Sequence, residues 1–235
     1  MRVIDRKCSL LPYGTSRLLF FLAAFLFVSV RLSLAEVVRY AGIMGGIATL
    51  SADAGSERVG QGLNLSSYAP ANGGALDVFV GAHLHNYFSV QGDFIWNKNS
   101  LRLNSTSSGT GSFYEEDRSS TQEAAIFSFL IYFRPQASRI RPYLGTGIGV
   151  AHLASSSERL VASAGAPSLP AVRFSSTGPV LRSHVGIDLR VTHKVDFRYS
   201  FSETIGSNEI SRNLSPRGPR RLANFQNLFG FIIRF

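Results

Sequence analysis

The residues best suited to chemistry are charged side chains that alternate with apolar ones along several segments. On a segment with a period of two, these charged side chains share the face that the large apolar residues leave free. If that face lines a narrow interior, opposite charges must pair, because burial of an unpaired charge is costly. We therefore expect a network of interior ion pairs that stiffens the fold, and the alternative is a gated polar path for ions or small solutes. The members expected in this network are Asp77, Asp93, Arg134, Asp188, Arg190, Asp196, Arg198 and Arg234.

Catalytic and metal-binding chemistry finds little support in the sequence. None of the 5 histidines stands in a His-x-Ser arrangement, and no acidic partner can be assigned to any of them. His83 and His85 lie two residues apart on one face, which is more typical of interior polar packing than of a metal site. No glycine-rich phosphate loop, His-Glu-x-x-His motif or cysteine cluster occurs. We expect no enzyme, no cofactor and no metal ligand.

The elements that position the charged side chains follow from the same alternation. The terminal segment 227–235 places Phe231, Ile233 and Phe235 on one apolar face, and a period of two is the period of a β-strand. With seven further segments that alternate in this way, the chain is expected to form eight strands. Those segments are 37–50, 76–85, 88–97, 123–134, 143–152, 184–191 and 195–202, and the facing of the first of them is ambiguous.

The expected connections alternate strictly between long and short. The long ones are 51–74, 98–121, 153–178 and 203–221, and the short ones are 85–87, 135–141 and 192–194. This pattern is typical of an up-and-down antiparallel barrel in an outer membrane, with short periplasmic turns and long outer loops. Because lipid cannot satisfy a free strand edge, the last strand must pair with the first.

Three features favour a barrel with lipid outside over a soluble, lipocalin-like periplasmic barrel. The polar sets are rich in glycine, as at Gly145, Gly147 and Gly149, which suits a narrow interior. Aromatic residues gather near strand ends, as in the belts at membrane interfaces. Each segment also has about the length of ~9–11 residues that a tilted strand needs to cross a bilayer. We therefore predict an all-β, eight-stranded antiparallel up-and-down transmembrane barrel over residues 36–235.

The N-terminus reads as a secretory signal peptide over residues 1–35. A basic start is followed by the apolar run 18–30 and by small residues at Ser33 and Ala35. The alternative is an uncleaved membrane anchor. Cleavage before Glu36 removes Cys8, the only cysteine, and lowers the net charge from +9 to +5, since five basic residues and one acidic residue leave with the leader. Part of the high basicity thus belongs to the leader, so nucleic acid is not an expected partner.

Several segments resemble a known family. The export signal, the segments 141–152 and 195–201 and the terminal Phe-Gly-Phe-Ile-Ile-Arg-Phe are similar to eight-stranded outer-membrane barrels. This group contains the transmembrane domain of OmpA-like proteins and small porin-like barrels of Gram-negative bacteria. The resemblance covers residues 37–235. It implies a place in the cell outer membrane, and it implies that Phe231, Ile233 and Phe235 are read by the barrel-assembly machinery. Nothing follows the last strand, so no peptidoglycan-binding domain is expected.

We expect a structural or surface-interactive role, exerted by a monomer through its outer loops and its lipid contacts. Arg220 and Arg221 immediately precede the final strand, and their guanidinium groups suit the phosphates of lipopolysaccharide. The alternative is a solvated basic loop. Two other functions stay open, a narrow porin for ions or small solutes and a soluble ligand-binding barrel.

Overall fold

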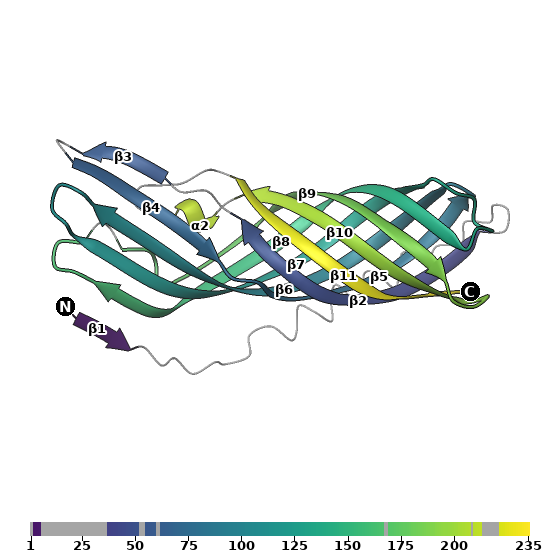
Figure 1. Ribbon diagram of the computed structural model, residues 1–235, viewed down its shortest axis with the longest axis horizontal. Helices are drawn as coiled ribbons and strands as arrows, with labels where there is room; N and C mark the ends of the chain where they lie inside the picture. The colour runs from purple at the N-terminus through teal and green to yellow at the C-terminus, as the bar shows by residue number, and fades with distance from the viewer. Residues whose placement is uncertain are drawn as a thin grey trace.

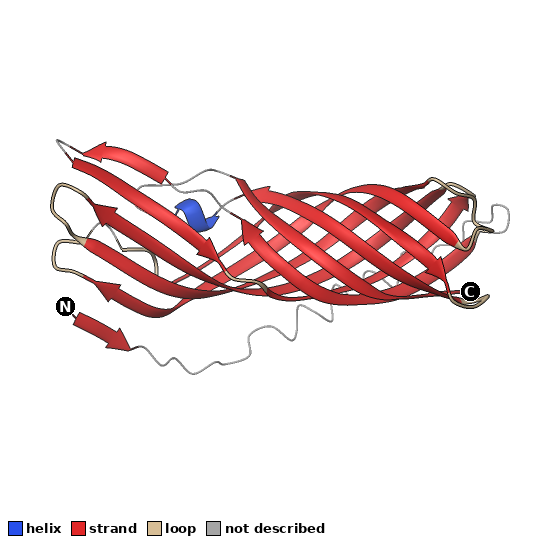
Figure 2. Cartoon of the chain, in the orientation of Figure 1, coloured by secondary structure: helices blue, strands red, loops and turns tan. Residues whose placement is uncertain are grey.

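A computed structural model describes residues 2–5, 37–51, 55–59, 62–166, 169–207, 209–212 and 221–235. The predicted signal peptide lies outside these residues except for residues 2–5, and its cleavage stays a prediction. Most of the described chain is β-strand (Figure 2). No helix among the described residues is long and apolar enough to cross a membrane.

Eight strands close into one antiparallel ring, drawn in Figure 1 as a long barrel. The order around the ring follows the chain, and closure is made by β11 and β2, which pair from Ala223↔Ser51 to Arg234↔Tyr40. The predicted fold class is therefore confirmed. The ring strands are β2 (Val38–Ser51), β5 (Gly73–His85), β6 (Phe88–Ser107), β7 (Phe113–Tyr132), β8 (Ile140–Ala162), β9 (Arg173–Arg190), β10 (Val195–Ser207) and β11 (Arg221–Arg234).

In the half of the barrel that holds the short turns, the apolar residues point outward. Phe127 is 60% exposed and Phe231 is 55% exposed, whereas Asp93 and Arg198 are buried inside. A soluble barrel has the opposite arrangement, with apolar residues within and polar ones outside. The facing of β2, which the sequence leaves ambiguous, is resolved in the same sense, since Tyr40 and Met44 point inward and Ile43 points outward.

The other half departs from the prediction, because the described residues of three expected loops, 51–74, 98–121 and 153–178, are mainly strand. β6 and β7 pair up to Thr106↔Phe113, and β7 and β8 pair up to Tyr114↔Ala162. A hairpin of β3 (Gly55–Val59) and β4 (Gly62–Pro70) adds to the upper part of β6. These segments form a raised sheet, described over residues 55–59, 62–70, 98–121, 153–166 and 169–178, which we call the outer wall; β3 and β4 lie at its free end in Figure 1.

The outer wall has the inverse alternation of the lower barrel. Leu101, Leu103 and Tyr114 point inward and are buried, while Arg102 and Asp117 point outward. Apolar-in and polar-out is the pattern of a sheet with one face in water. The short helix α2 (Glu209–Arg212) closes over this interior through Ile210, which is fully buried. The apolar cluster so formed comprises Leu50, Tyr68, Leu101, Leu103, Tyr114, Leu153, Ile210 and Leu222.

One further strand lies outside the ring. β1 (Arg2–Asp5) pairs with the far end of β8 from Arg2↔Ala162 to Asp5↔Arg159. Because β1 belongs to the predicted signal peptide, this pairing would be lost on cleavage, and the ring of eight strands does not depend on it.

Candidate functional site

The centre of the barrel interior holds one arginine between two aspartates. Arg182 of β9 places Nη2 3.1 Å from Asp77 Oδ2 and Nη1 3.3 Å from Asp93 Oδ1, and none of the three side chains is exposed. The Ser128 hydroxyl donates to Asp93 Oδ2 at 2.8 Å, and Gln91 Nε2 donates to Asp93 Oδ1 at 2.5 Å. Because two acids share one cation in a dry interior, these hydrogen bonds carry part of the stabilisation of the second carboxylate.

A second cluster lies nearer the short turns, around Arg198 of β10. Its Nε and Nη2 contact the two carboxylate oxygens of Asp188 at 2.6 and 2.8 Å, which is a bidentate pair. Its Nη1 donates to Gln91 Oε1 at 2.7 Å, so Gln91 joins this cluster to the first one. The guanidinium also lies 4.8 Å from the ring centroid of Tyr143 and 5.0 Å from that of Phe79.

Two further contacts complete the charged interior at the lower end. Arg234 of β11 donates to Asp196 Oδ1 at 2.9 Å. Arg141 stacks over the ring of Tyr132, with its guanidinium carbon 3.8 Å from the ring centroid. The interior of this half is thus crossed by charged and aromatic side chains from nearly every ring strand.

Six of the eight residues expected in the charge network lie in the interior, and two do not. Asp77, Asp93, Asp188, Asp196, Arg198 and Arg234 are buried. Placing Arg134 inside was wrong, because β7 ends at Tyr132 and the alternation of a strand has no meaning in the exposed turn that follows. Arg190 lies at the rim instead of in the network, where it donates to the backbone carbonyls of Gln136 and Ala137.

Arg182, the central cation, is not among the residues that the sequence pattern places in the interior. The expected loop ends at 178 and the expected strand begins at His184, so Arg182 falls between them, although it shares the parity of His184 and Asp188. A buried pair in the outer wall was missed for the same reason, since Arg118 Nη1 lies 2.8 Å from Glu116 Oε1 within a segment read as a loop. In both cases the missing information was strand length.

Glycines make room for the interior side chains of neighbouring strands. A Cβ at Gly145 would overlap the ring of His184, and a Cβ at Gly186 would overlap the hydroxyl of Tyr143. The glycine-rich inward face of β8 is therefore a consequence of the packing in a narrow barrel.

Above the charged clusters, a layer of amides bridges opposite walls. Gln226 Nε2 of β11 donates to Asn97 Oδ1 of β6 at 3.1 Å, and Asn224 Nδ2 donates to Gln122 Oε1 of β7 at 2.5 Å. With the apolar cluster under α2 above it and the ion pairs below it, this layer fills the lumen. Eight strands enclose a space that side chains just fill.

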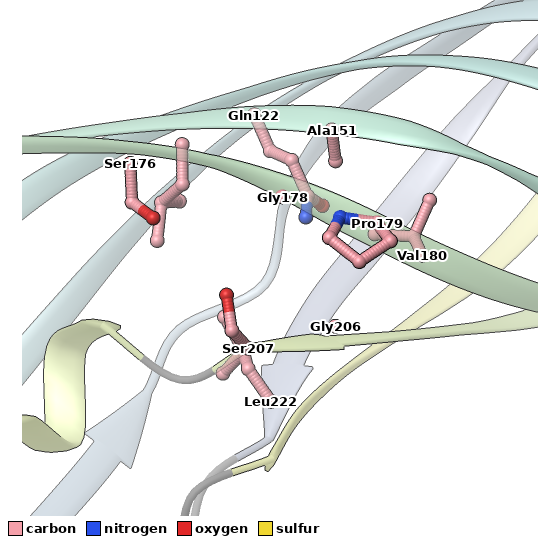
Figure 3. Close-up of a pocket in the computed structure, with 10 residues that line it drawn as sticks. Gln122, Ala151, Ser176, Gly178, Pro179, Val180, Gly206, Ser207 and Leu222 are labelled. Carbon is pink, nitrogen blue, oxygen red and sulfur yellow. The ribbon is translucent and has the colours of Figure 1, made fainter.

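One small pocket opens at the top of the lower half of the barrel (Figure 3). It forms because the pairing of β10 with β9 ends at Ile205↔Leu181, whereas β9 continues to Arg173. Pro179, which has no N–H to leave unpaired, stands at this divergence. Its volume of about 20 Å³ suits roughly one water molecule. The lining comprises Gln122, Ala151, Leu153, Ser176, Gly178, Pro179, Val180, Gly206, Ser207 and Leu222.

The remaining residues singled out in the sequence lie apart from the charged clusters. His83 packs between the rings of Tyr40 and Tyr132, whereas His85 is exposed. Within the described ranges no three His, Cys, Asp or Glu side chains gather in a way that would hold a metal ion. Arg221 is exposed as the first residue of β11, and Arg220 lies outside the described residues.

The C-terminal residues Phe231, Ile233 and Phe235 point outward and are 55%, 56% and 71% exposed. The backbone N–H of Phe235 donates to the Arg39 carbonyl at 3.0 Å, so the chain end is tied to the start of β2. Their recognition by the barrel-assembly machinery stays a prediction.

No protein-family model matches the chain, and no curated protein matches it. Among solved structures, it is similar to Neisserial surface protein A, at 12% identity and a TM-score of 0.49 over 84% of this chain and 97% of that one. It is also similar to Ail of Yersinia pestis, at 11% identity and a TM-score of 0.48 over 85% and 99% of the two chains. The outer membrane protein AlkL gives 15% identity and a TM-score of 0.37 over 83% and 90%. The fold itself rests on the closed strand ring described above.

Proposed function

We propose that this chain is an integral outer-membrane barrel with a sealed lumen, which acts through its outer wall at the cell surface. The observation that carries the proposal is the reversal of side-chain facing along the barrel. In the lower half the large apolar residues face outward and the charges are paired inside. In the outer wall Leu101, Leu103 and Tyr114 turn inward, and most charged residues face outward, apart from the buried pair of Glu116 and Arg118. A solvent boundary that encircles the barrel accounts for both patterns.

The level of that boundary is defined by neighbouring strands. Trp96, Glu123, His152 and Thr177 are register partners on β6 to β9, and together they form one row on the outer surface. The row below them is apolar and includes Phe94 and Val150, while Lys98 stands one outward position above Trp96 on β6. From the short turns to this row β6 and β7 have about nine and ten residues, the length that crosses a bilayer with tilt, whereas β8 and β9 have about thirteen and fourteen.

A surface role is favoured by the way the residues are distributed. The interior clusters pair their charges across the barrel, and eight strands leave a space that side chains just fill, so we assign the lumen a stiffening role. The outer wall and its connections extend the barrel beyond the boundary row, and such segments carry specificity in other folds. We propose that partners are met there, by a monomer.

The porin alternative gives a direct test of the sealed lumen. In planar bilayers the protein should show no resolvable single-channel steps, because ion pairs, bridging amides and the apolar cluster under α2 block the axis in turn. The matched variant is Ile210→Ser, which loosens only the apolar cluster under α2 and should likewise show no conductance steps. Regular conductance steps from the unmodified protein would contradict the sealed lumen and support a narrow porin.

Lipopolysaccharide stays a proposed partner of the segment before the last strand. Arg221 is exposed and begins β11, at the end of that strand remote from the short turns, where outer-leaflet phosphates are expected. We expect Arg220→Ala with Arg221→Ala to weaken lipopolysaccharide binding by about fivefold or more, from the loss of charge-assisted contacts near a surface. Binding would be measured by calorimetry in detergent, with Arg134→Ala and Arg139→Ala at the opposite end as the control. An unchanged affinity would leave only a solvated basic loop.

A further inference from the structure

The end of the barrel that carries the short turns presents exposed cations and almost no acid. Within residues 37–41, 85–88, 133–141 and 191–195 there is no Asp or Glu. Glu36, which precedes these ranges in the sequence, lies outside the described residues, and the nearest described carboxyl, Asp196, is buried and pairs with Arg234. The exposed basic side chains at this end are Arg39, Arg134, Arg139, His193 and Lys194.

These cations have no ion-pair partner among the described residues, in contrast to the charges of the outer wall. There, Arg102 Nε lies 2.8 Å from Asp117 Oδ1 and 3.2 Å from Glu115 Oε1. No such contact forms for Arg134, Arg139 or Lys194 within the part of the chain that the structure describes. The two ends of the barrel therefore differ in charge. The outer wall carries both basic and acidic side chains, and the end with the short turns carries exposed basic side chains without an ion-pair partner among the described residues.

Three of the cations are held in one sector by a bridge between two turns. Arg134 and Arg139 flank the turn between β7 and β8, and Lys194 lies in the turn between β9 and β10. Arg190 of β9 reaches back to the first turn, where Nη1 donates to the Ala137 carbonyl at 3.0 Å. Its backbone N–H donates to the Arg139 carbonyl at 2.8 Å. The two turns are thus fixed side by side.

An aliphatic surface rises from this sector toward the bilayer centre. On β8, Ile140, Leu144 and Ile148 point outward and are 43%, 49% and 69% exposed. On the neighbouring β9, Val185 and Val191 are 47% and 61% exposed. A largely aliphatic face, interrupted by Thr146 and Ser183, above a group of cations has the two parts of a phospholipid-binding surface, one for acyl chains and one for a phosphate.

We propose that this sector binds an anionic phospholipid of the inner leaflet, with its phosphate at Arg134, Arg139 and Lys194. The acyl chains lie along the outer face of β8 and β9. Basic residues near a membrane surface attract anionic headgroups, and guanidinium groups suit phosphate oxygens. The inner leaflet is the source because the short turns lie at the opposite end of the barrel from the outer wall (Figure 1).

The test is lipid selectivity in reconstituted membranes. The protein is placed in phosphatidylcholine bilayers with a trace of spin-labelled phosphatidylglycerol or spin-labelled phosphatidylcholine, and the motionally restricted fraction of each label is measured. We expect roughly fivefold preference for phosphatidylglycerol at low salt, and its loss in Arg134→Gln, Arg139→Gln, Lys194→Gln, because each cation near the surface contributes to headgroup attraction. The preference should also fall in ~1 M salt, where exposed charges are screened.

A control variant removes the same amount of charge from the outer side. Lys98→Gln, Arg102→Gln, Arg173→Gln should keep the preference, since these side chains lie above the boundary row. Circular dichroism would be used to check that both triple variants keep the strand content of the barrel. The proposal is overturned if the unmodified protein shows no preference, if the turn variant keeps it, or if soluble anionic muropeptides abolish it.

Discussion

Replacing Arg182 with alanine should lower the free energy of unfolding by about 3–5 kcal/mol, measured by denaturant titration in lipid bilayers. Arg182 contacts both Asp77 and Asp93 in a region without exposure to solvent, so its removal leaves two buried carboxylates without a cation. The cost arises from those uncompensated charges and not from the loss of a favourable pair as such. Arg102→Ala is the control, because its exposed ion pairs are worth at most about 1 kcal/mol.

A combined variant separates charge compensation from packing. Arg182→Met together with Asp77→Asn and Asp93→Asn removes the charges on both sides and should recover most of the lost stability, since buried ion pairs are often replaceable by neutral residues of similar size. A single Arg182→Ala that costs less than about 1 kcal/mol would mean that water reaches the cluster. The lumen would then not be sealed at this level.

The second large effect is expected at the lipid-facing surface. Phe129→Arg should destabilise the barrel by about 2–4 kcal/mol, the cost of an arginine near the bilayer midplane of a transmembrane barrel. Phe129 is 38% exposed, stacks on Phe88 and lies midway between the short turn and the boundary row. The measurement is again the unfolding free energy in bilayers of defined thickness.

The same strand supplies a matched control for this substitution. Phe113 begins β7 in the outer wall and is 37% exposed, which nearly equals the exposure of Phe129. Phe113→Arg should change stability by no more than about 0.5 kcal/mol, as for an ordinary surface substitution. Equal effects of the two substitutions would contradict the membrane boundary drawn between them.

Strand number, closure and facing of the lower barrel were predictable because they depend on one local signal. In that half most outward positions are apolar, as at Phe127 and Ile131, whereas the inward positions mix charged, polar and glycine residues with buried apolar ones such as Leu130 and Met44. Lipid outside and a narrow interior impose this alternation residue by residue.

The outer wall was not predictable from the same pattern, because above the boundary row outward positions become mainly polar and residues such as Leu101 and Leu103 point inward. Leu101 and Leu103 carry a period of two, but the surrounding Ser, Thr and Asn residues read as loop. Strand ends also set the limits of the site prediction, since the predicted strand 123–134 includes Arg134 and the predicted strand 184–191 excludes Arg182. Which partners an interior charge meets depends on the register between strands distant in sequence, such as β5 and β9 for Asp77 and Arg182.

The central claim is that the outward-facing apolar side chains of the strands contact acyl chains, while the interior of the barrel stays dry. Its most direct test uses Phe127→Trp in a protein whose only native tryptophan, Trp96, is replaced by phenylalanine. In bilayers of brominated lipids, the fluorescence of the new tryptophan should be quenched most by bromines deep in the acyl chains and little by aqueous acrylamide. Strong quenching by acrylamide without quenching by brominated lipid would contradict the account.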